Sequence, residues 1–250
     1  MNEDAQKPIV NLPAKDLNIE PITLHEVEDE IKKRLSLIDT EFNRGFDFVK
    51  TQEKSVTFFG SARFDEDNEH YLRARRVGYK LAKLGYSILT GGGPGIMEGA
   101  NRGAYEAEGK SLGLNIKLPH EQVRNPYLTD SVDFYYFFTR KVMLTFSAEA
   151  YIFFPGGFGT LDEFFEILTL VQTNKIERVP LILVGNDFWQ NLDHFIHKEM
   201  YLNNKAVDEE DMKFYTITQD EDEIVEIVKN AHIRNGVRFL HKNDDIASQK

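Results

Sequence analysis

The chain has 250 residues, of which 41% are apolar, so it is long enough for one domain with a substantial core. It contains no apolar run of the roughly 18 residues that suggest a membrane helix, and a net charge of −11 argues against binding polymeric nucleic acid. There is no cysteine for a disulfide or a thiolate metal site, and the polar N-terminus lacks the apolar segment of a secretory signal. We therefore expect a cytoplasmic protein without membrane or nucleic-acid partners.

The pattern of the first 50 residues predicts a loose N-terminal arm followed by an amphipathic helix. Residues 1–15 are polar, and Thr23-Leu-His-Glu26 has the pattern of a capping box that opens a helix over residues 23–50. Because its apolar stripe is continuous, we expect the helix to bury it at a subunit interface or against the main domain. The stripe consists of Val27, Ile31, Leu35, Ile38, Phe42, Phe46 and Val49.

Strand and helix patterns alternate over residues 51–235. Several strands are apolar on both faces, as strands buried between two helix layers are. The sequence therefore predicts an α/β fold with a doubly wound parallel sheet and helices on both faces, extended by the N-terminal helix and followed by a tail at 236–250. Strands are predicted at 55–60, 86–90, 111–116, 131–137, 150–155, 180–185 and 213–217, and helices at 67–84, 95–108, 140–148, 160–174, 187–202 and 220–234.

Two glycine-rich turns connect a predicted strand to a predicted helix. The first runs from Gly91 to Gly95 and the second from Pro155 to Gly159. Glycine lets backbone N–H groups approach an anion closely, and the N-terminus of a helix favours negative charge. One such turn is weak evidence, since tight turns also use glycine for geometry alone. Two turns at the carboxyl ends of parallel strands favour a site for a nucleotide or a sugar phosphate.

The second turn continues into an acidic segment. Thr160 is predicted to cap the following helix, which places Glu163 in the first turn, where its charge would repel a phosphate. We therefore expect Glu163 to act on positive charge that develops in a reaction. The helix N-terminus is expected to keep it ionised, as a base and electrostatic stabiliser. Glu166 is either a second acid or a solvated surface residue.

A third segment carries two cations. Thr139 is predicted to cap a helix and to place Arg140 and Lys141 in its first turn, where the helix dipole disfavours cations. A local rule that is broken twice suggests function, and a planar guanidinium fits a phosphate or ribose hydroxyls. The alternative is that both are surface residues or pair with nearby acids.

Together these segments resemble the LOG ("lonely guy") family, the cytokinin riboside 5′-monophosphate phosphoribohydrolases. The resemblance covers roughly residues 55–200, and the segment from Pro155 to Glu163 has the specific pattern PGGxGTxxE. It implies a Rossmann-like homodimer or higher homo-oligomer that uses no cofactor. The implied reaction hydrolyses the N-glycosidic bond of AMP or N6-modified AMP to free base and ribose 5-phosphate. It also implies catalysis by Arg140 and Glu163 and substrate binding by Ser61, Gly91, Gly92, Gly93, Met97, Lys141, Gly156, Gly157, Gly159 and Thr160.

The chain departs from the small members of the family by its N-terminal helix and by Glu98, which stands where they usually have glycine. These differences leave the base open between adenine, an N6-substituted adenine and another base. A non-catalytic nucleotide sensor is the main alternative, although binding alone would not require Glu163. A lysine decarboxylase would need a pyridoxal phosphate site, and a dehydrogenase a G-x-G-x-x-G turn; neither pattern is evident. The scattered histidines predict no metal site.

Overall fold

The computed structural model describes residues 24–52, 54–117 and 124–232. The chain divides into two compact units, Met1–Leu37 and Ile38–Lys250. Helix α1 (Leu24–Val49) spans the division, which confirms the predicted helix, whereas Thr23 lies outside the described residues. No helix in the described ranges has both the length and the hydropathy needed to cross a bilayer.

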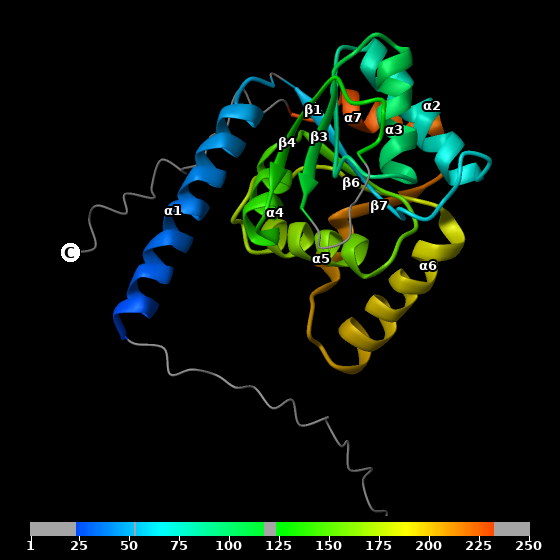
Figure 1. The fold of residues 1–250 in the computed structure, drawn as a ribbon. Coiled ribbons are helices and arrows are strands. Elements are labelled where there is room, and N and C mark those ends of the chain that lie inside the picture. Colours follow the sequence, from blue (N-terminus) through cyan, green and yellow to red (C-terminus); the bar gives the residue numbers. More distant parts are fainter. Residues whose placement is uncertain (1–23, 53, 118–123, 233–250) are drawn as a thin grey trace, which may run out of the picture. The chain divides into compact units, whose positions relative to one another are not determined.

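The second unit is built on a seven-stranded sheet in which every neighbouring pair is parallel (Figure 1). The strand order is β4-β3-β2-β1-β5-β6-β7, so the direction of winding reverses between β1 and β5. Ligands bind such sheets at the carboxyl ends of the strands near this reversal. The strands are β1 (Ser55–Phe59), β2 (Ser87–Thr90), β3 (Ser111–Ile116), β4 (Asp130–Phe134), β5 (Ala150–Phe153), β6 (Leu181–Val184) and β7 (Tyr215–Thr218).

Helices cover both faces of the sheet, which confirms the predicted doubly wound fold. One core lies between the sheet and helices α2, α3 and α7; the other lies beneath α4, α5 and α6. The bounds are α2 (Glu69–Lys83), α3 (Ile96–Glu106), α4 (Phe137–Phe146), α5 (Phe158–Gln172), α6 (Asn186–Phe195) and α7 (Glu221–Lys229), with a π-helical segment at Ile196–Asn203 and a 3₁₀ segment at Glu209–Lys213.

The apolar side chains alternate between these two cores along each central strand. In β1, Val56 and Phe58 pack beneath α2 and α3, whereas Phe59 faces the opposite core. Because every β1 residue is buried, the strand is fixed from both sides, and the loop that follows it starts from a rigid edge. The same holds for β2 and β5, whose residues are all buried.

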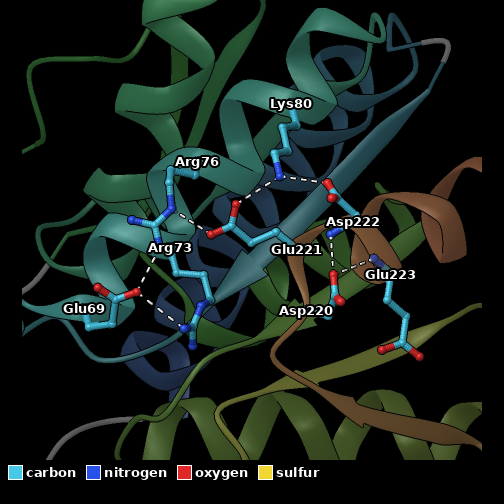
Figure 2. A network of polar contacts seen from close by, with 8 residues as sticks. All are labelled: Glu69, Arg73, Arg76, Lys80, Asp220, Glu221, Asp222 and Glu223. Carbon is cyan, nitrogen blue, oxygen red and sulfur yellow. Dashed lines mark hydrogen bonds and ion pairs between the residues drawn. The ribbon is translucent and has the colours of Figure 1, made fainter.

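An ion-pair network holds α7 against α2 on one side of the sheet (Figure 2). Arg76 of α2 bonds both Glu69 and Glu221, and Lys80 of α2 pairs with Glu221 and Asp222. Asp220 caps α7 by accepting hydrogen bonds from the backbone N–H groups of Asp222 (2.9 Å) and Glu223 (3.2 Å). Each of these cations therefore has at least two acidic partners.

Candidate functional site

Three strand-to-helix loops meet at the carboxyl edge of the sheet, and Ser61 joins them through its main chain. The Ser61 N–H donates to the carbonyl oxygen of Pro155 (3.0 Å), and the Ile96 N–H donates to the carbonyl oxygen of Ser61 (3.0 Å). Gly95 has a φ of +71°, and a Cβ there would overlap the Ser61 carbonyl oxygen, so only glycine fits. The loops after β1, β2 and β5 therefore form one scaffold beside the reversal of strand order.

The loop at Gly91–Gly93 is fixed from below by buried polar groups. The Gly92 N–H donates to the hydroxyl of Thr90 (2.8 Å), and the Asn125 N–H donates to the Gly92 carbonyl oxygen (2.9 Å). The Asn125 side-chain amide donates to the Gly93 carbonyl oxygen (3.1 Å). Sequence reasoning missed Asn125, since its partners lie about 30 residues away and no local pattern marks it. The glycine loop is therefore held in place by hydrogen bonds from residues outside it.

Helix α4 carries the two predicted cations, but its start differs from the prediction. The N-cap is Tyr136 and the helix begins at Phe137, so the prediction that Thr139 is the cap is wrong. Arg140 and Lys141 are the fourth and fifth helical residues, beyond the first turn in which the dipole acts most strongly. The Thr139 hydroxyl does not cap the helix; it lies 2.6 Å from a carboxylate of another helix and 2.8 Å from the carbonyl oxygen of Tyr136, one turn back.

Arg140 reaches from α4 across the sheet edge to the glycine loop. Its Nε donates to the carbonyl oxygen of Leu114 in β3 (2.8 Å), and a Cβ at Gly91 would overlap its Nη2 atom. The same added Cβ would lie 2.9 Å from the sulfur of Met97. Burial lowers the pKa of Arg140, and the nearby charge of Glu163 opposes that shift. Gly91, Met97 and Arg140 are thus brought together, with the guanidinium buried.

Glu163 lies in the second turn of α5, not in the first. The N-cap of α5 is Gly157, so the prediction that Thr160 is the cap is also wrong; Thr160 is buried and is the third residue of the helix. The Glu163 side chain is 8% exposed, and its Oε2 atom has no hydrogen-bond partner. Burial raises its pKa to about 7, although the charge of Arg140 works in the opposite direction. The raised pKa runs against the expectation that a helix terminus keeps Glu163 ionised, because burial outweighs the neighbouring charges.

Arg140 and Glu163 are both buried and their charges interact, but they do not form an ion pair. No nitrogen–oxygen distance between these two described side chains is 4.0 Å or less. A buried cation and a buried carboxylate that remain separate keep their hydrogen-bonding groups for another molecule. This pair is the chemical centre of the candidate site.

Lys141 is engaged by two acids of the next helix. Its Nζ lies 2.9 Å from Asp162 Oδ2 and 2.8 Å from Glu166 Oε2. Burial would lower the pKa of Lys141, but these two carboxylates outweigh it, and the pKa is raised. The alternative that Lys141 pairs with nearby acids is thereby confirmed, and Glu166 is one of its partners. The pairs link α4 to α5 at the outer side of the site.

The glycines of the second turn differ in the space around them. A Cβ at Gly156 would overlap the Thr160 hydroxyl, whereas a Cβ at Gly157 or Gly159 would meet nothing within 4 Å. Phe158, between them, is 95% exposed. An open hollow of about 540 Å³ follows on the outer face of α5, and it is lined by Phe158, Leu161, Asp162, Phe165, Glu166, Thr169 and Leu170. The backbone at Gly157 and Gly159 is therefore accessible, while that at Gly156 is packed.

Histidine, aspartate and glutamate side chains do not gather into a metal site in the described part of the chain. No group of three or more of them is arranged to hold an ion there.

Comparison with known families places this site in context. A family model described as "Possible lysine decarboxylase" matches residues 97–228, which is just over half of the chain. The matched region contains Met97, the Arg140–Lys141 pair and the whole second glycine turn, whereas Ser61 and the first glycine turn precede it.

Curated relatives match between about half and two thirds of the chain. A pyrimidine/purine nucleotide 5′-monophosphate nucleosidase of Escherichia coli is 31% identical over 144 residues, which are 52% of this chain and 32% of that protein. A probable cytokinin riboside 5′-monophosphate phosphoribohydrolase of Oryza sativa is 29% identical over 53% of this chain and 54% of its own length. A cytokinin riboside 5′-monophosphate phosphoribohydrolase of Arabidopsis thaliana is 25% identical over 64% of this chain and 72% of its own length. The chain thus spans about a third of the E. coli relative and about half of the rice one.

Solved structures support the fold. The X-ray structure of a structural-genomics target has a TM-score of 0.53 and 26% identity, over 70% of this chain and 98% of that one. The molybdenum cofactor binding protein of Rippkaea orientalis has a TM-score of 0.50 and 22% identity, over 70% of this chain and 96% of that one. Both structures share the fold over a larger part of the chain than the segment that the family model matches.

Proposed function

Because the chain belongs to the LOG family, whose model is described as possible lysine decarboxylase, we propose that it is a nucleoside 5′-monophosphate phosphoribohydrolase. The reaction is hydrolysis of the N-glycosidic bond of AMP or an N6-modified AMP to free base and ribose 5-phosphate. The observation that carries the proposal is the buried, separated pair Arg140 and Glu163 beside two glycine-rich turns. The relatives are named as a nucleotide 5′-monophosphate nucleosidase and a phosphoribohydrolase. Both names denote hydrolysis of an N-glycosidic bond, which supports the same class of reaction for this chain.

Glu163 has the environment that this reaction needs. Breaking a ribosyl C–N bond builds positive charge on the sugar, and a nearby carboxylate stabilises it. Water then adds its hydroxyl to the anomeric carbon, the bond electrons leave with the base, and a proton reaches the base nitrogen. With a pKa of about 7, Glu163 can accept the proton of the attacking water at neutral pH and release it again. Its unbonded Oε2 atom is the proton acceptor in this scheme.

Arg140 and the second glycine turn supply the anion contacts. The Nε atom of Arg140 is held by Leu114, which leaves the Nη groups for the phosphate, the ribose hydroxyls or the departing base. The accessible backbone at Gly157 and Gly159 opens α5, where free N–H groups and the helix dipole favour a phosphate. Gly156 and Thr160 pack against each other and hold this turn in shape.

The chemistry of Lys141 argues against decarboxylation of lysine. A Schiff-base lysine needs a lowered pKa and a free amine, whereas Lys141 is paired with Asp162 and Glu166 and its pKa is raised. Its position suits a structural link between α4 and α5.

We further propose that the protein is cytoplasmic and that it forms the homodimer or higher homo-oligomer that the family resemblance implies. A second copy would cover the exposed Phe158 and the half-buried Leu161, Phe165 and Leu170 on the outer face of α5. We expect the mass in solution to be at least twice 28.9 kDa. Phe158→Asp is expected to reduce the mass, and a wild-type mass equal to one chain would contradict an oligomer.

The test is release of free base from AMP, an N6-prenylated AMP and CMP, followed by chromatography, with Glu163→Gln as the control. Release by the wild type and not by the variant supports the reaction, and the ratio of rates identifies the preferred base. Binding of AMP without release from any nucleotide would favour the nucleotide sensor. A parallel assay for carbon dioxide from lysine is expected to be negative.

A further inference from the structure

The N-terminus of α4 lacks a cap from its own residues. Its N-cap is Tyr136, whose side chain makes no capping hydrogen bond, and the helix begins with two phenylalanines, Phe137 and Phe138. The first N–H groups of a helix have no partner within the helix, and an aromatic N-cap provides none. The helix that carries Arg140 and Lys141 therefore depends on another element at this end.

That element is the C-terminal part of α1, which provides Glu41. Its Oε1 atom accepts a hydrogen bond from the Tyr135 N–H, and its Oε2 atom accepts one from the Tyr136 N–H at 3.3 Å. The hydroxyl of Thr139 also lies 2.6 Å from Oε2. One carboxylate thus bonds the N–H groups of the N-cap residue Tyr136 and of Tyr135 before it, together with the hydroxyl of the third helical residue, Thr139.

Packing fixes Glu41 in this place. The side chain is 8% exposed, which is rare for a glutamate unless it is well bonded. One turn further along α1, a Cβ at Gly45 would lie 2.5 Å from the Cγ atom of Met143, so α1 and α4 approach closely there. The ring of Phe42 lies 6.4 Å from the ring of Phe138. This segment of α1 therefore docks on α4 with the carboxylate aimed at its first turn.

We propose that Glu41 is a positioning residue for the site: it caps α4 from outside and thereby fixes the helix that presents Arg140 and Lys141. This inference rests on the proposed function and adds to it a residue that lies outside the segment matched by the family model. A negative charge at a helix N-terminus stabilises the first turn, and hydrogen bonds to a charged acceptor are stronger than neutral ones. Arg140 directly follows Thr139, so a shift of that turn moves the guanidinium away from Gly91 and Glu163.

Burial of Arg140 makes its position sensitive to this cap. The guanidinium is fixed at one end by Leu114 and is too close to Gly91 to tolerate an added methyl group. A displacement of about 1 Å in a catalytic group can reduce turnover by up to about 10²-fold. A cap that holds the first turn of α4 is therefore expected to influence kcat and, through the anion contacts of Arg140, the affinity for the substrate as well.

The experiment compares Glu41→Gln and Glu41→Ala with the control Phe42→Leu, which weakens the same helix contact but leaves the carboxylate in place. For each protein, kcat and KM for AMP, the melting temperature and the amide exchange of residues 135–139 are measured. We expect kcat to fall about tenfold in Glu41→Gln and further in Glu41→Ala, with faster exchange at Tyr136. Phe42→Leu is expected to lower the melting temperature similarly and to keep kcat within about twofold.

Two results would overturn the inference. Equal losses of kcat in Glu41→Gln and Phe42→Leu would mean that Glu41 acts through general stability alone, and unchanged exchange at Tyr135 and Tyr136 would mean that no cap was lost. Failure of the proposed function is distinguishable, because wild-type protein would then release no base from any nucleotide. The affinity for AMP and the exchange of residues 135–139 would in that case decide the role of Glu41.

Discussion

Two groups of charged residues in this protein have opposite electrostatic properties. In the network between α2 and α7, Arg76 bonds Glu69 and Glu221, and Lys80 bonds Glu221 and Asp222 (Figure 2). Burial alone would raise the pKa of Glu221, but hydrogen bonds from Arg76 and Lys80 outweigh it, and the pKa is lowered. Each charge in this network is neutralised by a direct partner.

At the candidate site the balance is reversed. Glu163 is more deeply buried than Glu221, and the attraction of Arg140 does not compensate, so its pKa rises to about 7. Direct pairing stabilises a fold and leaves no group free, whereas buried charges without an ion-pair partner destabilise the fold and remain available for a substrate. The comparison thus separates charges that serve structure from charges that serve function, and four measurements can break or sharpen it.

The largest expected effect is on turnover. Glu163→Gln should lower kcat by about 10²- to 10⁴-fold while AMP still binds, since the amide neither accepts the proton of water nor stabilises a cationic sugar. Glu221→Gln removes the same carboxylate chemistry from the network and should leave kcat unchanged. Similar turnover in the two variants, measured at saturating AMP, would remove Glu163 from the mechanism.

A smaller loss is expected from Gly91→Ala. Its Cβ would overlap Arg140 Nη2 and crowd Met97, so the guanidinium must move, and kcat/KM should fall about 10- to 100-fold. If displacement of Arg140 is the cause, the same substitution should have little effect once Arg140 is already replaced by alanine. Additive losses in the double variant would show that Gly91 acts on the substrate independently.

The pH dependence of stability should also differ at Glu163. Its pKa is higher in the folded chain than in the unfolded one. Its contribution to the free energy of unfolding is therefore complete below about pH 4.3 and is lost as the pH rises through about 7. Glu163→Gln should therefore be more stable than wild type at pH 8, by about 1 to 3 kcal/mol, with a smaller difference at pH 5. Urea unfolding at both pH values measures this, and a constant difference would contradict the raised pKa.

The smallest effect is expected in the network. Glu221 has a lowered pKa, so its contribution to the free energy of unfolding is present above about pH 4.3. That contribution is lost as the pH falls through the pKa of Glu221 in the folded state. Glu221→Gln should cost no more than about 1 kcal/mol at pH 7, because the pairs are partly exposed and screened. The loss should shrink in 1 M salt. Insensitivity to salt would point to packing of α7 and not to charge.

Residue patterns predicted the parallel sheet well because buried strands and amphipathic helices have local periodicity. Every predicted strand overlaps a strand of the sheet, and the two glycine turns lie at the carboxyl ends of β2 and β5 as expected. The helix starts were less predictable. Thr139 and Thr160 are good capping residues by type, yet α4 begins at Phe137 and α5 at Phe158, since Glu41 and the packed turn at Gly156 decide these ends.

The sequence by itself determined the fold class and the residue types of the site: glycines that admit an anion, an arginine with a planar fork and a glutamate beside them. Only the tertiary structure decided how these groups are charged and held. Burial raised the pKa of Glu163 against the expectation from its helix, and distant partners fixed the loop and the helix that form the site, Asn125 at Gly92 and Glu41 at α4. Burial and long-range hydrogen bonds depend on which segments meet in space, and local sequence patterns do not carry that information.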